Sequence, residues 1–372
     1  MFNRLLISCF FLVASTTLSL GAELREGFDR GRLNKFVWIT CQADYPRLVT
    51  FDEDVTSTTT TRYLTVSIDE NRGNVDTCAN REIYKKQISE LGLTPGLLEP
   101  FTFDDDVADL GPSMIAPDIQ NLESRCEDGD SDKVQRNELR LLQKKHVHDV
   151  TDPHWYTLRF RTRGAPPPCG SSRWVMAQWK YQAASGWPHE FSQNPFLAQR
   201  FDNGVFHITV QNDRCRCMVA MTDGDPDRIS DEQSLRAAPE GDVRQALKKS
   251  RPLKCTRSGK ICTPEDFTVW TVDGGAPPLL PDPQKGWVTM SYRIKALGEE
   301  QGEIDIYANG RFIVRVSGHV GYGDLTNSRM KFKFGAYRDR IPGTHHMDVD
   351  GICISGKIDN CDRTVTPVVQ SD

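Results

Sequence analysis

The fold class is clearest in residues 302–317, which read GEIDIYANGRFIVRVS. Polar and apolar residues alternate before Asn309-Gly310, as they do in half-buried β-strands. Asn-Gly is the strongest short signal for a two-residue hairpin turn, because both residues tolerate positive φ. The stretch therefore predicts a β-hairpin with strands at 302–308 and 311–317.

The same alternation of polar and apolar residues continues in both directions along the chain, where runs rich in Thr, Val, Phe and Tyr are separated by turn residues. Further strands are predicted at 48–51, 62–68, 135–142, 156–163, 173–181, 204–211, 287–295, 330–338 and 347–355. Short helices are predicted at 81–91 and 231–249. With 28 Gly and 21 Pro in 372 residues to form turns, the chain is expected to be all-β: an antiparallel β-sandwich (jelly roll) with loop and short helical insertions.

Residues 1–22 have the pattern of a secretory signal peptide. Arg4 precedes an apolar run from Leu5 to Leu20, and the small residues Gly21 and Ala22 follow. A transmembrane helix is the alternative, but Ser and Thr dilute the run, and a span needs about 20 apolar residues. We expect a secreted or periplasmic protein with one jelly-roll domain at 23–372, a monomer with no membrane attachment once the signal is removed.

The cysteine count supports export. Removing Cys9 with the signal segment leaves 11 − 1 = 10 cysteines, an even number that favours disulfides over free thiols. Two pairs are close enough to form short-loop disulfides: Cys255 with Cys262, and Cys353 with Cys361.

The strand pattern breaks at about 212–283, which we interpret as a cystine-rich insertion. Cys215 and Cys217 lie too close to pair with each other and are expected to reach elsewhere. A zinc site made by these two with Cys255 and Cys262 is an alternative, although zinc ligands usually show tighter paired spacing.

The net charge and the motifs argue against nucleic acid as a partner. The 46 Lys and Arg residues against 51 Asp and Glu give a formal net charge of −5, so no overall positive field attracts a polyanion. No nucleic-acid motif or Gly-rich phosphate loop is present. An anionic ligand must therefore meet a local basic patch.

Three predicted strands each place polar side chains on one face, since alternate residues of a strand point the same way. The strands at 135–142, 173–181 and 330–338 together offer Arg136, Glu138, Arg140, Gln178, Lys180, Lys331, Lys333 and Tyr337. If the three strands share one sheet, these residues form a cationic groove. The alternative is that they are ordinary surface residues of half-buried strands.

Such a groove suits β-elimination at a uronic acid. Abstracting the C5 proton is difficult because the neighbouring carboxylate is already anionic, so cations or amides must stabilise the enolate. A base takes the proton and an acid protonates the departing O4. Tyrosine can serve in either role, and nearby cations favour its ionised form.

Three segments resemble signatures of jelly-roll polysaccharide lyases of the heparin lyase I and glucuronan lyase group. They are RNELR at 136–140, VMAQWK at 175–180 and KFGAYR at 333–338, in the family's order. FLAQR at 196–200 and DVDGI at 348–352 add to the similarity. The resemblance implies that Gln178 and Arg136 or Arg140 neutralise the substrate carboxylate, and that Tyr337 is the catalytic acid and also a candidate base. Glu138, Lys331, Lys333, Arg338 and His207 are then expected to bind substrate.

One position departs from the family pattern, which commonly has His where this chain has Lys180. Lysine, with a reference pKa of about 10.4, is a poor base unless its surroundings lower that value. Three interpretations of Lys180 therefore stay open. It is a base of depressed pKa, or it is a second neutraliser of the substrate carboxylate while Tyr337 carries out both proton transfers. In the third, its presence indicates a chain that binds sugar without cleaving it. His207, and His319, His345 and His346 near the Tyr337 motif, are other candidates for the base.

Two further functions compete with the lyase. Glu303 and Asp305 share a strand face like the paired carboxylates of glucanases, but Tyr307, Ala308 and Asn309 stand where a further acid is needed. A noncatalytic, lectin-like sandwich is the other alternative. No cofactor is expected; Ca²⁺ near Asp348 and Asp350 is possible, but two carboxylates are too few to infer it.

Overall fold

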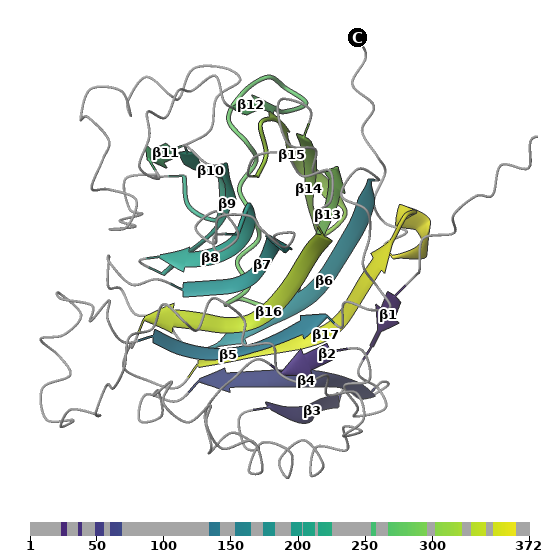
Figure 1. Cartoon of the computed structure of the whole chain (residues 1–372). Helices are drawn as coiled ribbons and strands as arrows, with labels where there is room; N and C mark the ends of the chain where they lie inside the picture. Colours follow the sequence, from purple (N-terminus) through teal and green to yellow (C-terminus); the bar gives the residue numbers. More distant parts are fainter. Residues whose placement is uncertain are drawn as a thin grey trace, which may run out of the picture.

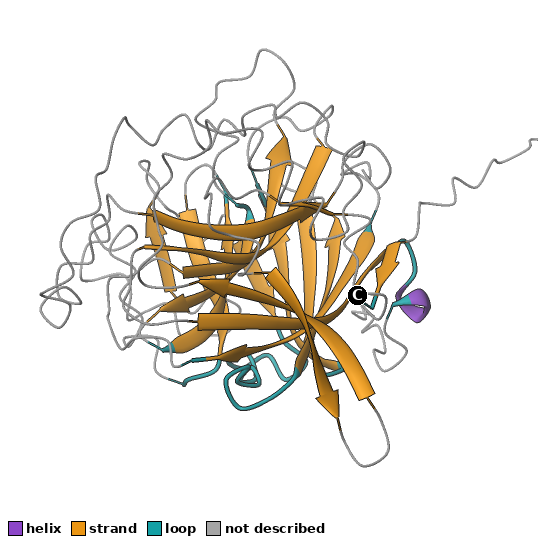
Figure 2. Ribbon diagram, turned by 90° about the horizontal axis from the view of Figure 1, so that it is seen from below, coloured by secondary structure: helices purple, strands orange, loops and turns teal. Residues whose placement is uncertain are grey.

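The computed structural model describes residues 24–27, 36–38, 49–55, 60–68, 134–141, 153–164, 174–182, 195–202, 204–212, 215–224, 254–257, 267–295, 302–321, 329–339 and 345–361. These residues form two antiparallel sheets that lie face to face (Figures 1 and 2). The predicted antiparallel jelly-roll sandwich is thus confirmed.

The first sheet has nine strands. Its order is β12 (Phe267–Trp270), β15 (Arg311–Gly318), β14 (Gly302–Ala308), β13 (Val288–Lys295), β6 (His154–Arg163), β17 (His345–Ser355), β4 (Thr60–Ile68) and β3 (Val49–Val55), and β1 (Leu24–Glu26) also pairs with β17.

The second sheet has eight strands and carries the candidate site. Its order is β11 (Lys254–Arg257), β10 (Cys215–Met221), β9 (Val205–Gln211), β8 (Leu197–Asp202), β7 (Trp174–Gln182), β16 (Arg329–Asp339), β5 (Val134–Leu141) and β2 (Phe36–Trp38). The three motif-bearing segments are therefore the adjacent strands β7, β16 and β5.

The predicted hairpin at 302–317 is confirmed. Asn309 and Gly310 both have positive φ, 49° and 79°, which is the conformation of a two-residue turn that matches strand twist. The Asn309 side-chain oxygen also accepts a hydrogen bond from the backbone N–H of Thr289, 2.8 Å away. The turn is thereby tied to the neighbouring strand β13.

Aromatic side chains from both sheets fill the space between them. The Trp179 ring of β7 packs against Tyr292 of β13 at 4.7 Å between centroids and against Phe332 of β16 at 4.9 Å. Tyr156 of β6 meets the same tryptophan edge-on at 5.9 Å. Each such buried side chain contributes on the order of 1.5–3 kcal/mol from burial alone, so this cluster anchors the strands that carry the site.

The stretch 212–283 differs from the expected insertion, since three of its segments join the sheets as β10, β11 and β12. β10 reads CRCMVAM, and Cys217, Val219 and Ala220 all lie in the core. An irregularity between Met218 and Ala220 shifts the register against β9, which removes the regular alternation that identifies a strand. The helices predicted at 81–91 and 231–249 lie outside the described residues.

The disulfide predictions are partly tested. Cys353 and Cys361 are bonded, with 5.3 Å between their Cα atoms, as predicted. Cys217 is also disulfide-bonded, so the zinc alternative that used its thiolate is wrong. Cys262 lies outside the described residues. Within the described ranges no helix has the length and apolar character needed to cross a membrane.

Candidate active site

The site rests on strand β16, which lies between β5 and β7. Lys333 of β16 is in register with Arg140 on β5 and with Gln178 on β7. Tyr337 is in register with Arg136 on β5. Neighbouring strands are about 4.8 Å apart, so residues of all three motifs lie within side-chain reach of one another.

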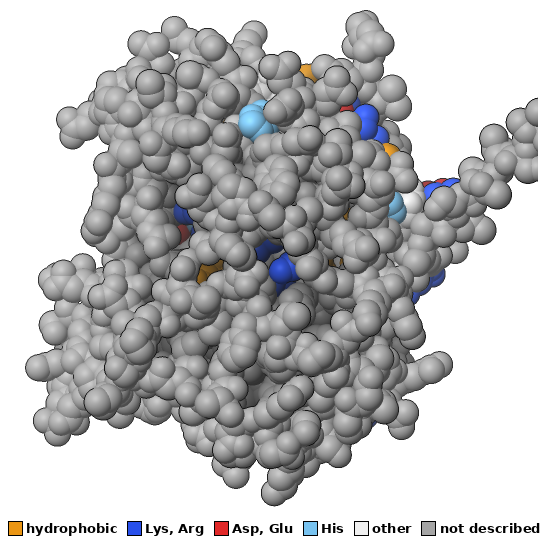
Figure 3. Space-filling model, in the orientation of Figure 1, with side chains coloured by type: hydrophobic (Ala, Val, Ile, Leu, Met, Phe, Trp, Pro, Cys, Tyr) orange, Lys and Arg blue, Asp and Glu red, His pale blue; other side chains and the backbone are white. Residues whose placement is uncertain are grey.

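Alternation assigns these residues to the face of the sheet that points away from the core. Phe332 and Phe334 of β16 belong to the core, which leaves Lys331 and Lys333 on the opposite face. On β5 the core residue is Leu139, so Glu138 faces the same way as the lysines. We call this surface the polar face, defined by Glu138, Gln178, Lys180, Lys333 and Tyr337. Lys and Arg side chains are visible in the middle of this side of the molecule (Figure 3).

Strand β7 follows the predicted alternation only in part. The register shifts between Val175 and Ala177 against β8, which indicates a β-bulge. As a result Trp174 and Met176 lie in the core together with Ala177 and Trp179, although alternation put the first two beside Gln178. Gln178 and Lys180 still share the polar face, because both follow the bulge.

Gln178 and Glu138 are joined across β16. The side-chain amide Nε2 of Gln178 donates a hydrogen bond to Oε1 of Glu138, and the two side chains are only 2% and 0% exposed. Between them stands Gly335, the β16 partner of Glu138, with φ 127°. Because Gly335 has no side chain, it leaves room for the side chains of Gln178 and Glu138 to meet across β16. Its positive φ also favours glycine at this position.

The polar face continues over β8 and β9. Phe206, Ile208 and Val210 of β9 point into the core, which places His207 on the polar face, where its Nδ1 lies 3.2 Å from the carbonyl oxygen of Val205. His207 is in register with Arg200 of β8.

Sequence reasoning missed Arg200 as a site residue. Its Nε donates to Thr209 Oγ1 at 2.9 Å, and it stands in register with Val175, the β7 partner of Tyr337. The signal was available, since core positions at Leu197 and Phe201 alternate with Arg200. The FLAQR segment at 196–200 contains Arg200, but the resemblance assigns it no role.

One predicted substrate-binding residue lies on the wrong face. Arg338 is fully buried, and its guanidinium lies over the ring of Trp174, 5.7 Å from the centroid. Trp174 belongs to the core and also packs against His345 at 4.8 Å. Arg338 follows Tyr337 directly in the strand, so alternation turns it inward.

Two of the other candidate histidines, His345 and His346, lie away from the polar face. His345 and His346 begin β17 of the nine-stranded sheet. His345 packs on Trp174, and His346 Nδ1 lies 2.6 Å from Ser67 Oγ. Of the candidate histidines in the described strands, His207 is therefore the one on the polar face.

The remaining predicted residues can be placed less completely. Lys331 is half-buried and in register with Lys180, so two ammonium groups neighbour each other at one end of the site. Arg136 and Arg140 are placed by the register of β5, while their side chains lie outside what the structure describes. The described side chains of β5, β16, β7 and β8 on this face include four cations, Lys180, Lys331, Lys333 and Arg200, and two carboxylates, Glu138 and Asp202. This balance suits an anionic ligand.

The paired carboxylates Glu303 and Asp305 lie away from the polar face and are bound by arginines. They lie on the nine-stranded sheet, where Asp305 accepts hydrogen bonds from Arg315 and Glu303 accepts one from Arg293. Burial raises the pKa of Asp305 above its ordinary range, and the Arg315 guanidinium opposes that shift. Both carboxylates are engaged by arginines.

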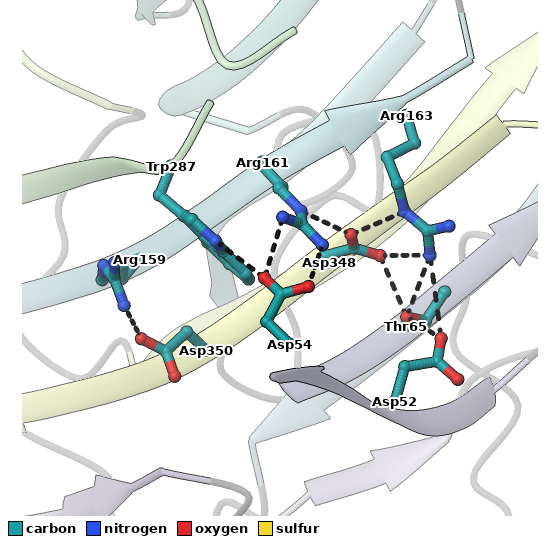
Figure 4. Close-up of polar contacts among 9 residues, drawn as sticks. All are labelled: Asp52, Asp54, Thr65, Arg159, Arg161, Arg163, Trp287, Asp348 and Asp350. Carbon is teal, nitrogen blue, oxygen red and sulfur yellow. Dashed lines mark hydrogen bonds and ion pairs between the residues drawn. The ribbon is translucent and has the colours of Figure 1, made fainter. Parts of the chain in front are cut away.

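The carboxylates considered for calcium are engaged in the same way (Figure 4). Asp348 is fully buried and accepts hydrogen bonds from Arg161 Nε at 2.8 Å and Arg163 Nε at 2.7 Å. Asp350 is paired with Arg159. No group of three or more His, Cys, Asp or Glu residues is arranged for a metal ion within the described ranges.

Comparison with known proteins assigns the class. The sequence model of the polysaccharide lyase family matches residues 118–352, which is more than half of the chain and includes all three motifs. The chain therefore belongs to the polysaccharide lyase family, and the protein is a polysaccharide lyase. A search of curated proteins finds no match.

Solved structures give more distant similarities. A variant of family 7 alginate lyase A1-II′ in complex with product is 12% identical, with a TM-score of 0.35 and 83% of each chain covered. The endo-β-1,4-glucuronan lyase from the fungus Trichoderma reesei is 9% identical, with a TM-score of 0.39, covering 88% of this chain and 98% of that one. The binding domain of botulinum neurotoxin DC is also similar, at 9% identity and a TM-score of 0.29, covering 61% of this chain and 37% of that one. These similarities concern the fold alone.

Proposed function

We propose that the protein cleaves a uronic-acid-containing polysaccharide by β-elimination and leaves an unsaturated sugar at the new non-reducing end. The observation that carries this proposal is the register of β16. It brings Tyr337, Lys333 and the Gln178–Glu138 pair onto one face of three adjacent strands.

The chemistry explains why the substrate should be a uronate. Elimination breaks the bond between C4 and its glycosidic oxygen after a proton leaves C5. In a neutral sugar that proton is not acidic, whereas in a uronate the C5 carboxylate delocalises the charge as an enolate. The enzyme must stabilise this extra negative charge. Lys333 and Lys180, both buried in the polar face, are cations suited to that task.

Each residue then has a distinct role. The free N–H of the Gln178 amide and the guanidinium of Arg136 neutralise the substrate carboxylate. Tyr337 is half-buried and protonates the departing O4. The same tyrosine oxygen first takes the C5 proton and then delivers that proton to O4, so one group serves as base and acid in turn.

For Lys180 we favour the role of second neutraliser. It stands opposite Lys331 in the sheet, so the two ammonium groups form one positive end of the polar face. A polyanionic chain lying across β7 and β16 would place carboxylates beside both.

We further propose that the enzyme belongs to the heparin lyase I and glucuronan lyase group and that it acts outside the cytoplasm as a monomer. The order of its three motifs supports the group. The signal-like residues 1–22 and the disulfides at Cys217 and Cys353–Cys361 support export, because disulfides persist in oxidising compartments.

The test is a panel of uronate polymers, including polyglucuronate, alginate and heparin, incubated with the purified mature protein. An unsaturated uronate absorbs in the ultraviolet, so a rise in absorbance with at least one polymer is expected. A hydrolase would release reducing ends without that absorbance. Tyr337→Phe provides the matched control for contaminating activity.

A further inference from the structure

Glu138 stands out on the polar face because its charge is wrong for a substrate-binding residue. It is fully buried, it is acidic, and it lies among lysines on a surface suited to an anionic chain. A carboxylate placed directly against a uronate would repel it, since like charges at short range are unfavourable. Its contact with Gln178 suggests another role.

That contact fixes the orientation of the Gln178 amide. A side-chain amide has a donating nitrogen and an accepting oxygen, and rotation by 180° exchanges them. An ionised carboxylate only accepts hydrogen bonds. The bond from Gln178 Nε2 to Glu138 Oε1 therefore selects the rotamer in which the nitrogen points toward β5 and β16.

The selected rotamer leaves a second amide hydrogen for the substrate. One N–H of Gln178 is bound by Glu138, and the same nitrogen carries a second N–H on the strand position that is in register with Lys333 of β16. The flipped amide would present its oxygen instead and repel a uronate carboxylate. Gly335 contributes by leaving the path across β16 open.

We propose that Glu138 is a positioning residue: it acts through Gln178 by holding the amide nitrogen toward the substrate carboxylate. This inference rests on the proposed uronate lyase activity. It also replaces the sequence-based expectation that Glu138 binds substrate itself.

The inference is tested by a double-mutant cycle of Glu138→Ala, Gln178→Ala and the double variant, with kcat and KM measured on the best uronate polymer. Each single variant is expected to lower kcat by about 10²-fold, because misplacing one catalytic contact has effects of that size. In the Gln178→Ala background, Glu138→Ala should cost less than about 3-fold more, since residues that act through each other are not additive.

Two further variants separate positioning from folding. Glu138→Gln keeps the size of the side chain and an accepting oxygen, so it should restore at least 10-fold of the kcat lost in Glu138→Ala. Gln199→Ala is the matched control, because it removes another buried glutamine hydrogen bond of this sheet, from Gln199 Nε2 to Tyr292 Oη at 2.8 Å on the core side. It should lower the melting temperature and leave kcat within about 3-fold of wild type.

The outcomes distinguish the two proposals. An additive cycle in an active enzyme overturns the positioning role while the lyase assignment stands. A rise in KM alone in Glu138→Ala would mean that Glu138 contacts the substrate, and it overturns the inference as well. If the wild-type protein shows no elimination on any uronate polymer, the proposed function fails and this inference fails with it.

Discussion

Tyr337 and Arg338 are neighbours in the chain but lie on opposite faces of β16. Arg338 is buried over the core residue Trp174, whereas Tyr337 is in register with Arg136 and Val175 on the polar face. One residue therefore serves the proposed chemistry and the next serves the fold, and substitutions at the two positions should have separable effects.

Replacing Tyr337 tests the chemistry. Tyr337→Phe removes one hydroxyl, so kcat should fall by about 10² to 10⁴-fold, the usual contribution of a positioned acid or base. Substrate affinity should change little, and the free energy of unfolding should stay within about 1 kcal/mol of wild type. Steady-state kinetics and urea denaturation measure both. A variant with near-normal kcat would remove Tyr337 from the mechanism.

Replacing Arg338 tests the fold. Arg338→Met should lower the free energy of unfolding by about 2 kcal/mol or more, because a desolvated cation–π contact of this kind is worth that much. The matched control is Arg311→Met, an exposed arginine at the start of β15, which should stay within about 0.5 kcal/mol of wild type. Equal stability of the two variants in urea denaturation would show that the Trp174 contact contributes nothing.

Lys180 is tested by a pair of substitutions. If it is a neutraliser, Lys180→Arg keeps the cation and should retain most activity, whereas Lys180→His should lose activity as the pH rises through about 6.5, where histidine loses its charge. The pH–rate profiles of both variants provide the measurement. Higher activity of Lys180→His than of Lys180→Arg above neutral pH would indicate a base at this position instead.

Much of the fold was predictable from alternation, but the features that complete the site were not. The strand at 302–308 was predicted with the bounds the structure has, because each residue there has one clear face. The bulge at 175–177 inserts one residue relative to β8. Nothing in the local sequence indicates this bulge. Alternation therefore predicted that Trp174 and Met176 lie on the polar face, whereas both lie in the core.

The contacts within the site depend on pairing between distant segments. Glu138 and Gln178 are 40 positions apart in the sequence, and the residues between them give no sign that the two side chains meet across a third strand. Their contact follows only from the order β5, β16, β7, in which β16 inserts between the other two although it begins 329 − 182 = 147 positions after the end of β7. Alternation alone gives the face of β8 on which Arg200 lies, but its position relative to Tyr337 is set by the pairing of both with β7.

The disulfide near the C-terminus should contribute measurably to stability. The chain-entropy relation gives about 2.5 kcal/mol for the separation of 8 residues between Cys353 and Cys361. Replacing both with Ser should lower the free energy of unfolding by about that amount, measured by denaturation without reductant. Lyase activity should persist, because Cys353 lies on β17 of the other sheet. Unchanged stability would show that the bond constrains neither state.

His346 should make stability depend on pH. Burial and the nearby Arg163 cation lower the pKa of its imidazole below the ordinary value of 6.5, so the unfolded chain binds this proton more tightly than the folded protein. The contribution of His346 to the free energy of unfolding is fully present above about pH 6.5. It is lost as the pH falls from there through the lower pKa of the folded state.

His346→Gln keeps a polar partner for Ser67 and removes the titration. The variant should therefore lose less stability than wild type between about pH 8 and pH 5, as measured by the urea midpoint at each pH. A variant whose midpoint falls as steeply as that of wild type would show that His346 does not contribute.

The most direct test of the lyase mechanism is digestion of a uronate polymer in oxygen-18-labelled water, followed by mass spectrometry of the oligosaccharides. Elimination adds no water across the broken bond, so the products should be unsaturated, one water lighter than hydrolysis products, and free of the label at times too short for the anomeric oxygen of the new reducing end to exchange with solvent. Their formation should require the hydroxyl of Tyr337. Saturated products carrying the label would contradict the account, since they would show that the glycosidic bond is hydrolysed.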